Sequence, residues 1–439
     1  MTTYGYIALG IVLSAIIYWL FGLIGKGKES KAIATLADMA ALGEVVPDTL
    51  HPKVDLDRCI GSGACVRACP EKDVLAVVHG QAVLVNPLAC VGHSACVDAC
   101  PVDAIQVVFG TANKGVELPK IDQNFQTTRP GVYVIGELGG MGLIRNAVSQ
   151  GKQAADHVIK NTRRAAGDAY DVAVVGAGPA GISATLRLLE ANLKVILLER
   201  EAFGGTIMHY PRAKVVMTGA LDFALVGRVK ATKMSKEELV ELWERIMREV
   251  KLPVQVGTLV EGVEGDDDGM WRLKTSGGPI RAANVMLGLG RRGSPRKLEC
   301  PGEESPKVHY RLLEPKEFAG KHVLVVGGGN SAVESALSLS DAQCCASVAI
   351  SYRKGAFARC RAENRRRIDE AIAIGAVQAL MPSEISRIEN DAVYLKSEGN
   401  EVKLQNDSII VQIGGTAPSE LLQKFGVEVV KKYGEAWRT

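Results

Sequence analysis

The longest apolar run in the chain lies at its start, where residues 4–25 carry no charge and consist mainly of aliphatic and aromatic residues. About twenty such residues are the length that a helix needs to cross a bilayer. Lysines follow directly, and the positive-inside rule then places the rest of the chain in the cytoplasm. The pattern predicts a single-pass protein of the cell inner membrane with its folded domains on the cytoplasmic side. A cleaved signal peptide is the alternative, but the run is long and no small-x-small cleavage site follows it at once.

Two shorter apolar runs predict buried strands, at residues 171–175 (DVAVV) and 322–326 (HVLVV). Each is followed by a glycine-rich turn, a helical segment and a second apolar run. This order of strand, turn, helix and strand is typical of βαβ units on a parallel sheet. The chain is therefore expected to be an α/β protein with two Rossmann-like domains.

The composition narrows the class of protein. With 439 residues, of which 47% are apolar and 23% charged, the chain is globular and long enough for about three domains. The net charge of +3 is too small for a dedicated nucleic-acid binder, so no nucleic-acid partner is expected. The 47 glycines are about 11% of the chain, against a usual share of about 7%, and suggest turns where backbone approaches phosphate groups.

Six of the ten cysteines fall into two runs that repeat, CIGSGACVRACP at residues 59–70 and CVGHSACVDACP at residues 90–101. The runs align at an offset of 31 positions, and a proline follows the last cysteine of each. Closely spaced thiolates suit an iron–sulfur cluster, because a short loop can present one ligand after another to its corners. Zinc binding and disulfide bonds are the alternatives, and the cytoplasm disfavours disulfide bonds.

Residues 51–110 resemble the two-cluster bacterial ferredoxins, which are small α+β domains. The resemblance implies that ligands cross between the runs, with Cys59, Cys65 and Cys100 on one cluster and Cys69, Cys90 and Cys96 on the other. The sequence departs from the family at the second cysteine of each run, where Ser62 and His93 stand. Either the clusters contain three irons, or these side chains bind a fourth. His93 is the better candidate ligand, because imidazole is a known ligand of iron.

The first glycine-rich turn, G-x-G-x-x-G, carries the dinucleotide-binding fingerprint. Its glycines are Gly176, Gly178 and Gly181. They allow a tight turn and the close approach of a pyrophosphate to the start of a helix. Glu199, at the end of the second strand, would accept a hydrogen bond from a ribose hydroxyl. A βαβ unit without a ligand is the alternative.

The second turn has the form G-x-G-x-x-A and spans Gly327, Gly329, Asn330, Ser331 and Ala332. Its second strand does not end in an acid but continues into Arg353 and Lys354, with Arg359 shortly after. Arginine pairs with a 2′-phosphate, whereas an acid would repel it, so the turn is expected to bind NADPH rather than NADH. The alternative for the later arginines is a solvated helix face.

Residues 170–415 resemble the low-molecular-weight thioredoxin reductases, a family of two-domain flavoproteins. The motifs that carry the resemblance are GAGPAG at 176–181, Gly204–Gly205–Thr206, PGE at 301–303, GGGNSA at 327–332 and YRK at 352–354. It implies FAD at the first turn, near Gly205 and Thr206, NADPH at the second turn, and a homodimer. The family's redox dithiol C-x-x-C is missing, so thioredoxin is not an expected substrate. As in the ferredoxin–NADP reductases of this fold, electrons would leave the flavin by another route.

The family's closing flavin-contacting segment has no counterpart after residue 415, and residues 127–160 resemble it instead. Gly136 and Glu137 stand where the family has Gly-Asp. The resemblance implies a circularly permuted flavoprotein, with Glu137 facing the ribityl or phosphate part of FAD. An unrelated connecting βα unit is the alternative.

The expected domains are a transmembrane helix (4–25), a linker with one or two helical turns (26–50), a ferredoxin-like domain (51–110), a permuted flavin segment (115–165), an FAD domain (168–295), an NAD(P)H domain (296–415) and a tail (416–439). A hydride donor supplies two electrons at once, a cluster carries one, and FAD bridges the two. We expect an oxidoreductase that moves electrons between NADPH and a protein or quinone partner in either direction, with no catalytic acid or base. The alternative is a non-catalytic redox sensor or a relay subunit of a larger membrane complex.

Overall fold

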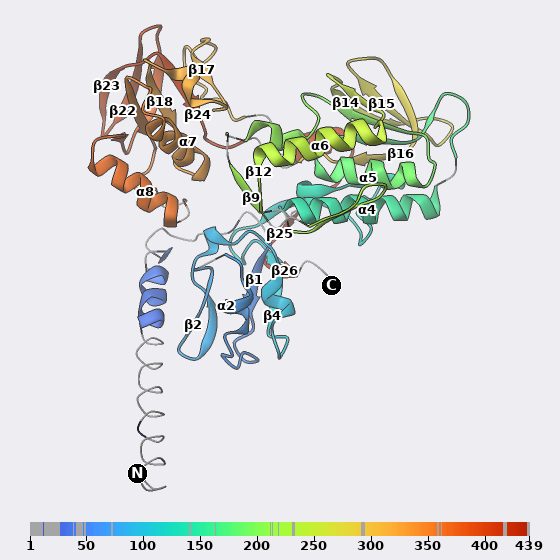
Figure 1. The fold of residues 1–439 in the computed structure, drawn as a ribbon, viewed down its shortest axis with the longest axis horizontal. Coiled ribbons are helices and arrows are strands. Elements are labelled where there is room, and N and C mark those ends of the chain that lie inside the picture. Colours follow the sequence, from blue (N-terminus) through green and yellow to red (C-terminus); the bar gives the residue numbers. More distant parts are fainter. Residues whose placement is uncertain are drawn as a thin grey trace, which may run out of the picture. The chain divides into compact units, whose positions relative to one another are not determined.

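The computed structural model describes residues 12, 27–37, 39–40, 47, 50–71, 73–139, 142–162, 164–210, 212, 214–217, 219–230, 233–290, 295–357, 360, 362–415 and 419–436. The chain divides into two compact units. The smaller unit comprises Met1–Gly115 and Tyr433–Thr439, and the larger unit comprises Val116–Lys432 (Figure 1). The C-terminal residues of the chain thus belong to the same unit as its N-terminal quarter.

The smaller unit is built on short antiparallel strands. A three-stranded sheet has the order β1 (His51–Val54), β4 (Ile105–Phe109) and β26 (Glu435–Ala436). A separate hairpin consists of β2 (Leu75–Val78) and β3 (Gln81–Leu84). The two cysteine runs form helices α2 (Ala64–Ala68) and α3 (Ala95–Asp98), and the short 3₁₀ helix η1 (Pro87–Ala89) precedes the second run. The helices pack on a small core in which buried cysteines lie among aliphatic side chains.

A helical segment at residues 27–37 packs on the hairpin of the smaller unit. Ala32 is buried there in one cluster with Val78 and Val85. The Glu29 carboxylate accepts a hydrogen bond from the backbone N–H of His79 at 2.7 Å. This part of the chain, expected to be a linker with one or two helical turns, therefore has apolar and polar contacts with the folded unit.

The expected membrane anchor is not supported. In the part of the chain that the structure describes, no helix has both the length and the apolar character needed to cross a membrane. Residues 4–25 lie outside the described residues, apart from Val12. The finding contradicts the predicted location as a single-pass protein of the inner membrane, which rested on the apolar run and the lysines that follow it.

The first half of the larger unit is a seven-stranded sheet. Its order is β13 (Val254–Val256), β8 (Val195–Glu199), β7 (Tyr170–Val175), β16 (Ile280–Leu287), β15 (Trp271–Thr275) and β14 (Val260–Gly265), and β6 (Val132–Val134) also pairs with β16. The pairs β13–β8, β8–β7, β7–β16 and β16–β6 are parallel, and the central strands β7 and β8 are almost continuously apolar, as buried parallel strands are. The sheet is covered by helices α4 (Ile144–Asn161) and α5 (Pro179–Glu190), which lie side by side in Figure 1.

The close packing of α4 on α5 depends on glycine. A Cβ atom added at Gly151 would stand 2.2 Å from the carbonyl oxygen of Ala180. Helix α6 (Lys236–Val250) adds a further layer and starts with a capping box between Ser235 and Glu238. Its buried Trp243 packs edge-on against Phe223.

The second half of the larger unit is a parallel five-stranded sheet. Its order is β17 (Val308–His309), β24 (Ser408–Val411), β18 (His322–Val326), β19 (Ser347–Ser351) and β20 (Gln378–Leu380). Helix α7 (Asn330–Asp341) connects β18 to β19, and helix α8 (Ala362–Ala373) lies between β19 and β20 in the sequence. A three-stranded antiparallel sheet follows along the chain, made of β21 (Glu384–Ile388), β22 (Ala392–Ser397) and β23 (Asn400–Gln405). Both Rossmann-like folds expected from the sequence are thus present.

Short elements complete the larger unit. Strand β25 (Val429–Lys432) pairs antiparallel with β5 (Val116–Pro119), after helix α9 (Ser419–Lys424). The other pairs are β9 (Val215–Met217) with β12 (Lys233–Ser235) and β10 (Leu221–Phe223) with β11 (Gly227–Val229). The 3₁₀ helices are η2 (Gly136–Gly139), η3 (Gly205–His209) and η4 (Pro315–Phe318). The residues expected to form a tail therefore supply strands to both units.

Candidate functional site

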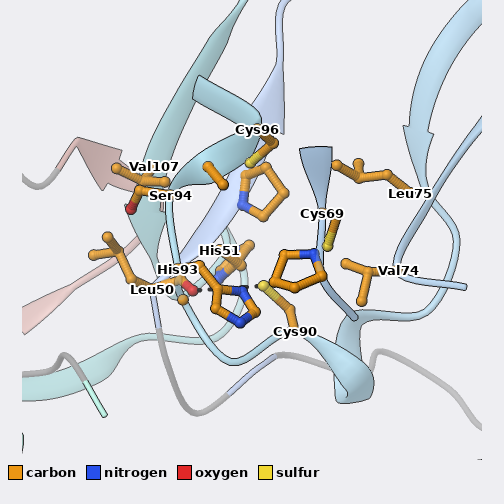
Figure 2. A pocket seen from close by; sticks show the side chains of 14 residues that line it. Leu50, His51, Cys69, Val74, Leu75, Cys90, His93, Ser94, Cys96 and Val107 are labelled. Carbon is orange, nitrogen blue, oxygen red and sulfur yellow. Dashed lines mark hydrogen bonds between the residues drawn. The ribbon is translucent and has the colours of Figure 1, made fainter. Parts of the chain in front are cut away.

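The smaller unit contains a pocket lined by cysteines of both runs, which we call the His93 pocket. Figure 2 shows the side chains of Cys69, Cys90, Cys96 and His93 around it, with His93 next to Cys90. His51, which the sequence did not single out, is buried in the same lining. The pocket thus combines three thiols with two imidazoles.

A second pocket, which we call the Ser62 pocket, has a matching construction. It is lined by Cys59, Cys65 and Cys100, together with Ser62. Backbone N–H groups of Ala82 and Ala104 donate hydrogen bonds to the sulfurs of Cys59 and Cys100, at 3.3 and 3.2 Å. Each pocket thus takes two cysteines from one run and one from the other.

Left-handed glycines place the loop of each run close to neighbouring backbone. Gly61 has φ +67°, and a Cβ atom there would stand 1.9 Å from the carbonyl oxygen of Gly80. Gly92 has φ +77°, and its Cβ would stand 3.1 Å from the carbonyl oxygen of Leu50. Only glycine fits such positions without strain, so these two residues hold Ser62 and His93 at the rims of their pockets.

Burial and neighbouring thiols both raise the pKa values of the cysteines in the two pockets. Burial raises the pKa of Cys96 to about 12, and Cys90 and Cys69 add to the effect. Burial also raises the pKa of Cys65, with further contributions from Cys59 and Cys100. Bound metal replaces the protons of such thiols. The three sulfurs of each pocket line a cavity, an arrangement that fits a cluster of several irons.

In the first dinucleotide turn of the larger unit, two of the three glycines have no room for a side chain and the third borders open space. At Gly176, with φ +99°, a Cβ atom would stand 2.4 Å from the carbonyl oxygen of Gly288. At Gly181 it would stand 1.9 Å from the carbonyl oxygen of Gly176. At Gly178, directly before α5, it would meet no described atom within 4 Å. The N-terminus of α5 therefore has free space in front of it, as a bound pyrophosphate requires.

Glu199 ends strand β8 beside this turn and is buried. One carboxylate oxygen accepts a hydrogen bond from the backbone N–H of Ala177 and the other from that of Glu201, both at 2.8 Å. Each carboxylate oxygen can accept a further hydrogen bond. Glu199 therefore shapes the turn and retains the capacity to bind a ribose hydroxyl.

Two further segments border the first turn. Gly205 has φ +61°, and a Cβ atom there would stand 3.1 Å from the Cα atom of Gly178, so the start of η3, with Thr206, lies against the turn. Gly136 has φ +79°, and its Cβ would stand 3.0 Å from the Cβ atom of Ala180. The carboxylate of Glu137, next in the chain, lies 3.2 Å from where a Cβ on Gly142 would stand.

Gln150 is a site residue that the sequence did not reveal. Its side-chain oxygen accepts a hydrogen bond from the backbone N–H of Gly136 at 2.9 Å. The residue is 3% exposed, and its Nε2 has no hydrogen-bond partner among the described residues. A buried donor of this kind is normally satisfied by a ligand or water, so Nε2 of Gln150 is available to a polar group beside Gly136.

The second dinucleotide turn has the same construction. A Cβ atom at Gly327, with φ +139°, would stand 2.3 Å from the carbonyl oxygen of Gln412, whereas Gly329 has no described neighbour within 4 Å. Asn330 and Ser331 start helix α7, and Ala332 is fully buried. The ring of Tyr352 lies 2.4 Å from where a Cβ on Gly328 would stand, so this aromatic side chain covers the middle glycine.

The basic residues expected to bind a phosphate follow strand β19. Arg353 and Lys354 are exposed, directly after the buried Tyr352. Arg359 lies outside the described residues. Arg366, farther along on α8, forms an ion pair with Glu370 of the same helix. Arg353 and Lys354 are thus the described cations nearest in sequence to the end of β19.

The four remaining cysteines do not form a C-x-x-C dithiol. All are free in the structure. Burial raises the pKa of Cys360 to about 12, so its thiol is protonated and unreactive at neutral pH. Cys344 donates a hydrogen bond to the carbonyl oxygen of Pro315.

The fold and the two kinds of site define a class of protein. The chain is an NAD(P)H-dependent FAD/iron–sulfur oxidoreductase, and it is not a thioredoxin reductase. Residues 173–436 match the pyridine nucleotide-disulphide oxidoreductase family, and the chain belongs to this family. Residues 51–101 match the 4Fe-4S dicluster domain.

Similar proteins include a ferredoxin–NADP reductase of Ignicoccus hospitalis, 30% identical over 267 residues, which cover 59% of this chain and 82% of the relative. The ferredoxin–NADP reductase of Rhodospirillum rubrum is 29% identical, over 60% of this chain and 77% of the relative. Among solved structures, bacillithiol disulfide reductase from Staphylococcus aureus superposes with a TM-score of 0.53 at 20% identity, covering 60% of this chain and 81% of its own. This last likeness shows the fold.

Proposed function

We propose that the chain moves electrons between NADPH and a redox partner through FAD and two iron–sulfur clusters. The observation that carries the proposal is the pair of open glycines, Gly178 and Gly329, each before a Rossmann helix in a chain that also has two three-thiol pockets. The relatives named ferredoxin–NADP reductase support it, because their partner is the kind of protein that residues 51–101 resemble.

FAD supplies the chemistry that couples a two-electron hydride donor to one-electron carriers. The chain's own residues position it. The α5 N-terminus beside Gly178 offers backbone N–H groups to the pyrophosphate, and Glu199 accepts from the ribose. In this proposal Gly136, Glu137, Gly205 and Thr206 border the same cofactor, supported by the closeness of Gly205 to Gly178 and of Gly136 to Ala180. Hydride transfer needs no protein acid or base, and none is assigned.

The second turn, with Arg353 and Lys354, binds the nicotinamide cofactor in this proposal. Exposed cations at the end of β19 favour the 2′-phosphate of NADPH over the bare ribose of NADH. Gly329 leaves room for the pyrophosphate in front of α7.

We also propose that the flavin domain is circularly permuted. Strand β6 pairs in parallel with β16 of the flavin sheet, and α4 packs against α5, although both precede the first strand of the Rossmann fold in sequence. The family match starts only at residue 173, so this segment lies ahead of it. Such a rearrangement is physically tolerated, because the termini of a compact domain often lie close together.

The proposed redox partner is a protein or a quinone, and the resembled flavoproteins imply a homodimer.

The proposal is tested by anaerobic purification of the full chain and titration with NADPH, while flavin and cluster absorption are followed separately. Bleaching of both, with NADPH more effective than NADH, is expected. Flavin that stays oxidised, or a protein that binds none, would refute the enzyme and leave a non-catalytic sensor. Flavin that bleaches while the clusters do not would refute the proposed electron path.

A further inference from the structure

The two cluster pockets differ at positions that the internal repeat makes equivalent. At the offset of 31, Ser62 corresponds to His93, and Arg67 corresponds to Asp98. The first run thus has a neutral hydroxyl and a cation at the positions where the second run has an imidazole and an anion. These differences bear directly on what each pocket can bind, because the second position of each run is where a fourth ligand would stand.

In the Ser62 pocket, the serine is engaged with its own loop. Its hydroxyl accepts a hydrogen bond from the backbone N–H of Ala64 at 3.4 Å, and its carbonyl oxygen accepts one from the Arg67 guanidinium at 3.2 Å. The Arg67 Nη1 atom also lies 3.3 Å from where a Cβ on Gly63 would stand. An exposed positive charge therefore lies against the loop that carries Ser62 in place of a cysteine.

A cation at that corner opposes the binding of another. A fourth iron would be a positive ion beside the loop that Arg67 contacts, with no thiolate to hold it. Arg67 is exposed, so solvent weakens this repulsion without reversing its sign. A cluster that lacks this iron is more negative, and Arg67 stabilises that extra charge. The charges around the Ser62 pocket thus favour an open corner.

The His93 pocket has the opposite character. Its loop carries an imidazole that lines the cavity next to Cys90 (Figure 2). Asp98 replaces the arginine, and the Glu71 carboxylate acts electrostatically on Cys69 and Cys90. A nitrogen ligand in anionic surroundings favours retention of a fourth iron.

We propose that the His93 pocket holds a four-iron cluster completed by His93, and that the Ser62 pocket holds a three-iron cluster. The inference rests on the proposed function, since it assumes that both pockets are loaded with clusters for electron transfer. It assigns different iron contents to two sites that the sequence repeat alone would treat as equal.

The test uses the full chain, purified anaerobically and then oxidised, with iron analysis and quantitative electron paramagnetic resonance. An oxidised three-iron cluster has an unpaired spin, and an oxidised four-iron cluster is silent. We expect about seven irons and about one spin per chain. Ser62→Cys should raise the iron content to about eight and abolish the spin. His93→Ala should lower it to about six and give about two spins.

Two further variants keep the test decisive. His79→Ala is the matched control, because His79 lies at the hairpin turn, outside both pocket linings, and should change neither quantity. If His93→Ala loses its whole cluster, His93→Cys must restore about seven irons and about one spin. Failure of that restoration overturns the proposal.

Other results overturn it directly. Wild-type protein with about eight irons and no spin would show two equal four-iron clusters, and an unchanged iron content in His93→Ala would exclude His93 as the ligand. These measurements need no NADPH, so they fail independently of the proposed function. A chain that binds no iron at all would refute the function itself.

Discussion

The side-chain oxygen of Gln150 accepts a hydrogen bond from the backbone N–H of Gly136 at 2.9 Å, deep inside the flavin domain. The bond connects helix α4 to the turn η2, in a segment that lies outside the matched family region. It holds Gly136, whose φ is +79°, in place beside the proposed FAD site. We therefore expect the stability of this half of the unit and its affinity for FAD to depend on the same side chain.

Replacing Gln150 by leucine removes this acceptor and leaves a buried N–H group without a partner. The free energy of unfolding should fall by about 1–3 kcal/mol, and FAD content after purification should fall as well. Gln153→Leu is the control, since Gln153 is exposed on the same helix. Urea unfolding and flavin absorption measure both effects. A Gln150→Leu protein as stable and as flavin-loaded as the control would contradict the role.

Substitution by alanine at two glycines of the first turn should have different effects, with loss of stability at Gly181 and loss of FAD binding at Gly178. Gly181→Ala should destabilise the fold by about 1–3 kcal/mol, because its Cβ meets the carbonyl oxygen of Gly176 at 1.9 Å. Gly178→Ala should leave the flavin-free protein as stable as wild type and weaken FAD binding by at least about tenfold. Thermal unfolding without cofactor and FAD titration separate the two effects. Equal loss of stability in both variants would rule out a cofactor in front of α5.

Arg353 decides the preference for NADPH in the proposed function. Arg353→Gln should raise the KM for NADPH by about tenfold or more and leave the KM for NADH nearly unchanged, because only the former has a 2′-phosphate. Steady-state reduction of an artificial electron acceptor measures both constants. Arg366→Gln is the matched control, since that residue is paired with Glu370 on α8. If the control shifts the preference equally, the basic helix face is the determinant instead.

Glu201 predicts a pH dependence of stability. Its hydrogen bond from Arg311 lowers its pKa from the ordinary 4.5 to about 2. The ionised carboxylate therefore contributes fully above pH 4.5, and the contribution is lost as the pH falls through about 2. The gain is about 1 kcal/mol or less, because the pair is partly exposed.

The comparison that checks this is urea unfolding of wild type and Glu201→Gln at a series of pH values. The difference between them should be largest near neutral pH and shrink toward pH 2. Arg311→Gln should show the same loss, and the double variant should lose little more than either single variant. A difference that does not vary with pH would exclude the ion pair as its origin.

The sequence revealed those parts of the site whose chemistry is local. The glycines at 176–181 and 327–332 and the two cysteine runs are contiguous motifs, so their spacing alone predicts the turns and pockets in which they lie. Gln150 and His51 escaped notice, because tertiary packing brings each of them to its site and such packing has no periodic signal in sequence. The inner-membrane location was inferred from the apolar run at the start of the chain and the lysines after it, and no helix among the described residues has the length and apolar character that it requires.

Strand β26 pairs with β4, and strand β25 pairs with β5, so the last described residues close a sheet in each unit. During synthesis the chain leaves the ribosome from its N-terminus, and early domains usually fold first. Here the smaller unit cannot complete its three-stranded sheet until residue 436 has emerged, after the whole larger unit. Its cysteines are therefore translated long before β26 can pair with β4, and full closure of the iron–sulfur unit waits for the synthesis of Glu435 and Ala436.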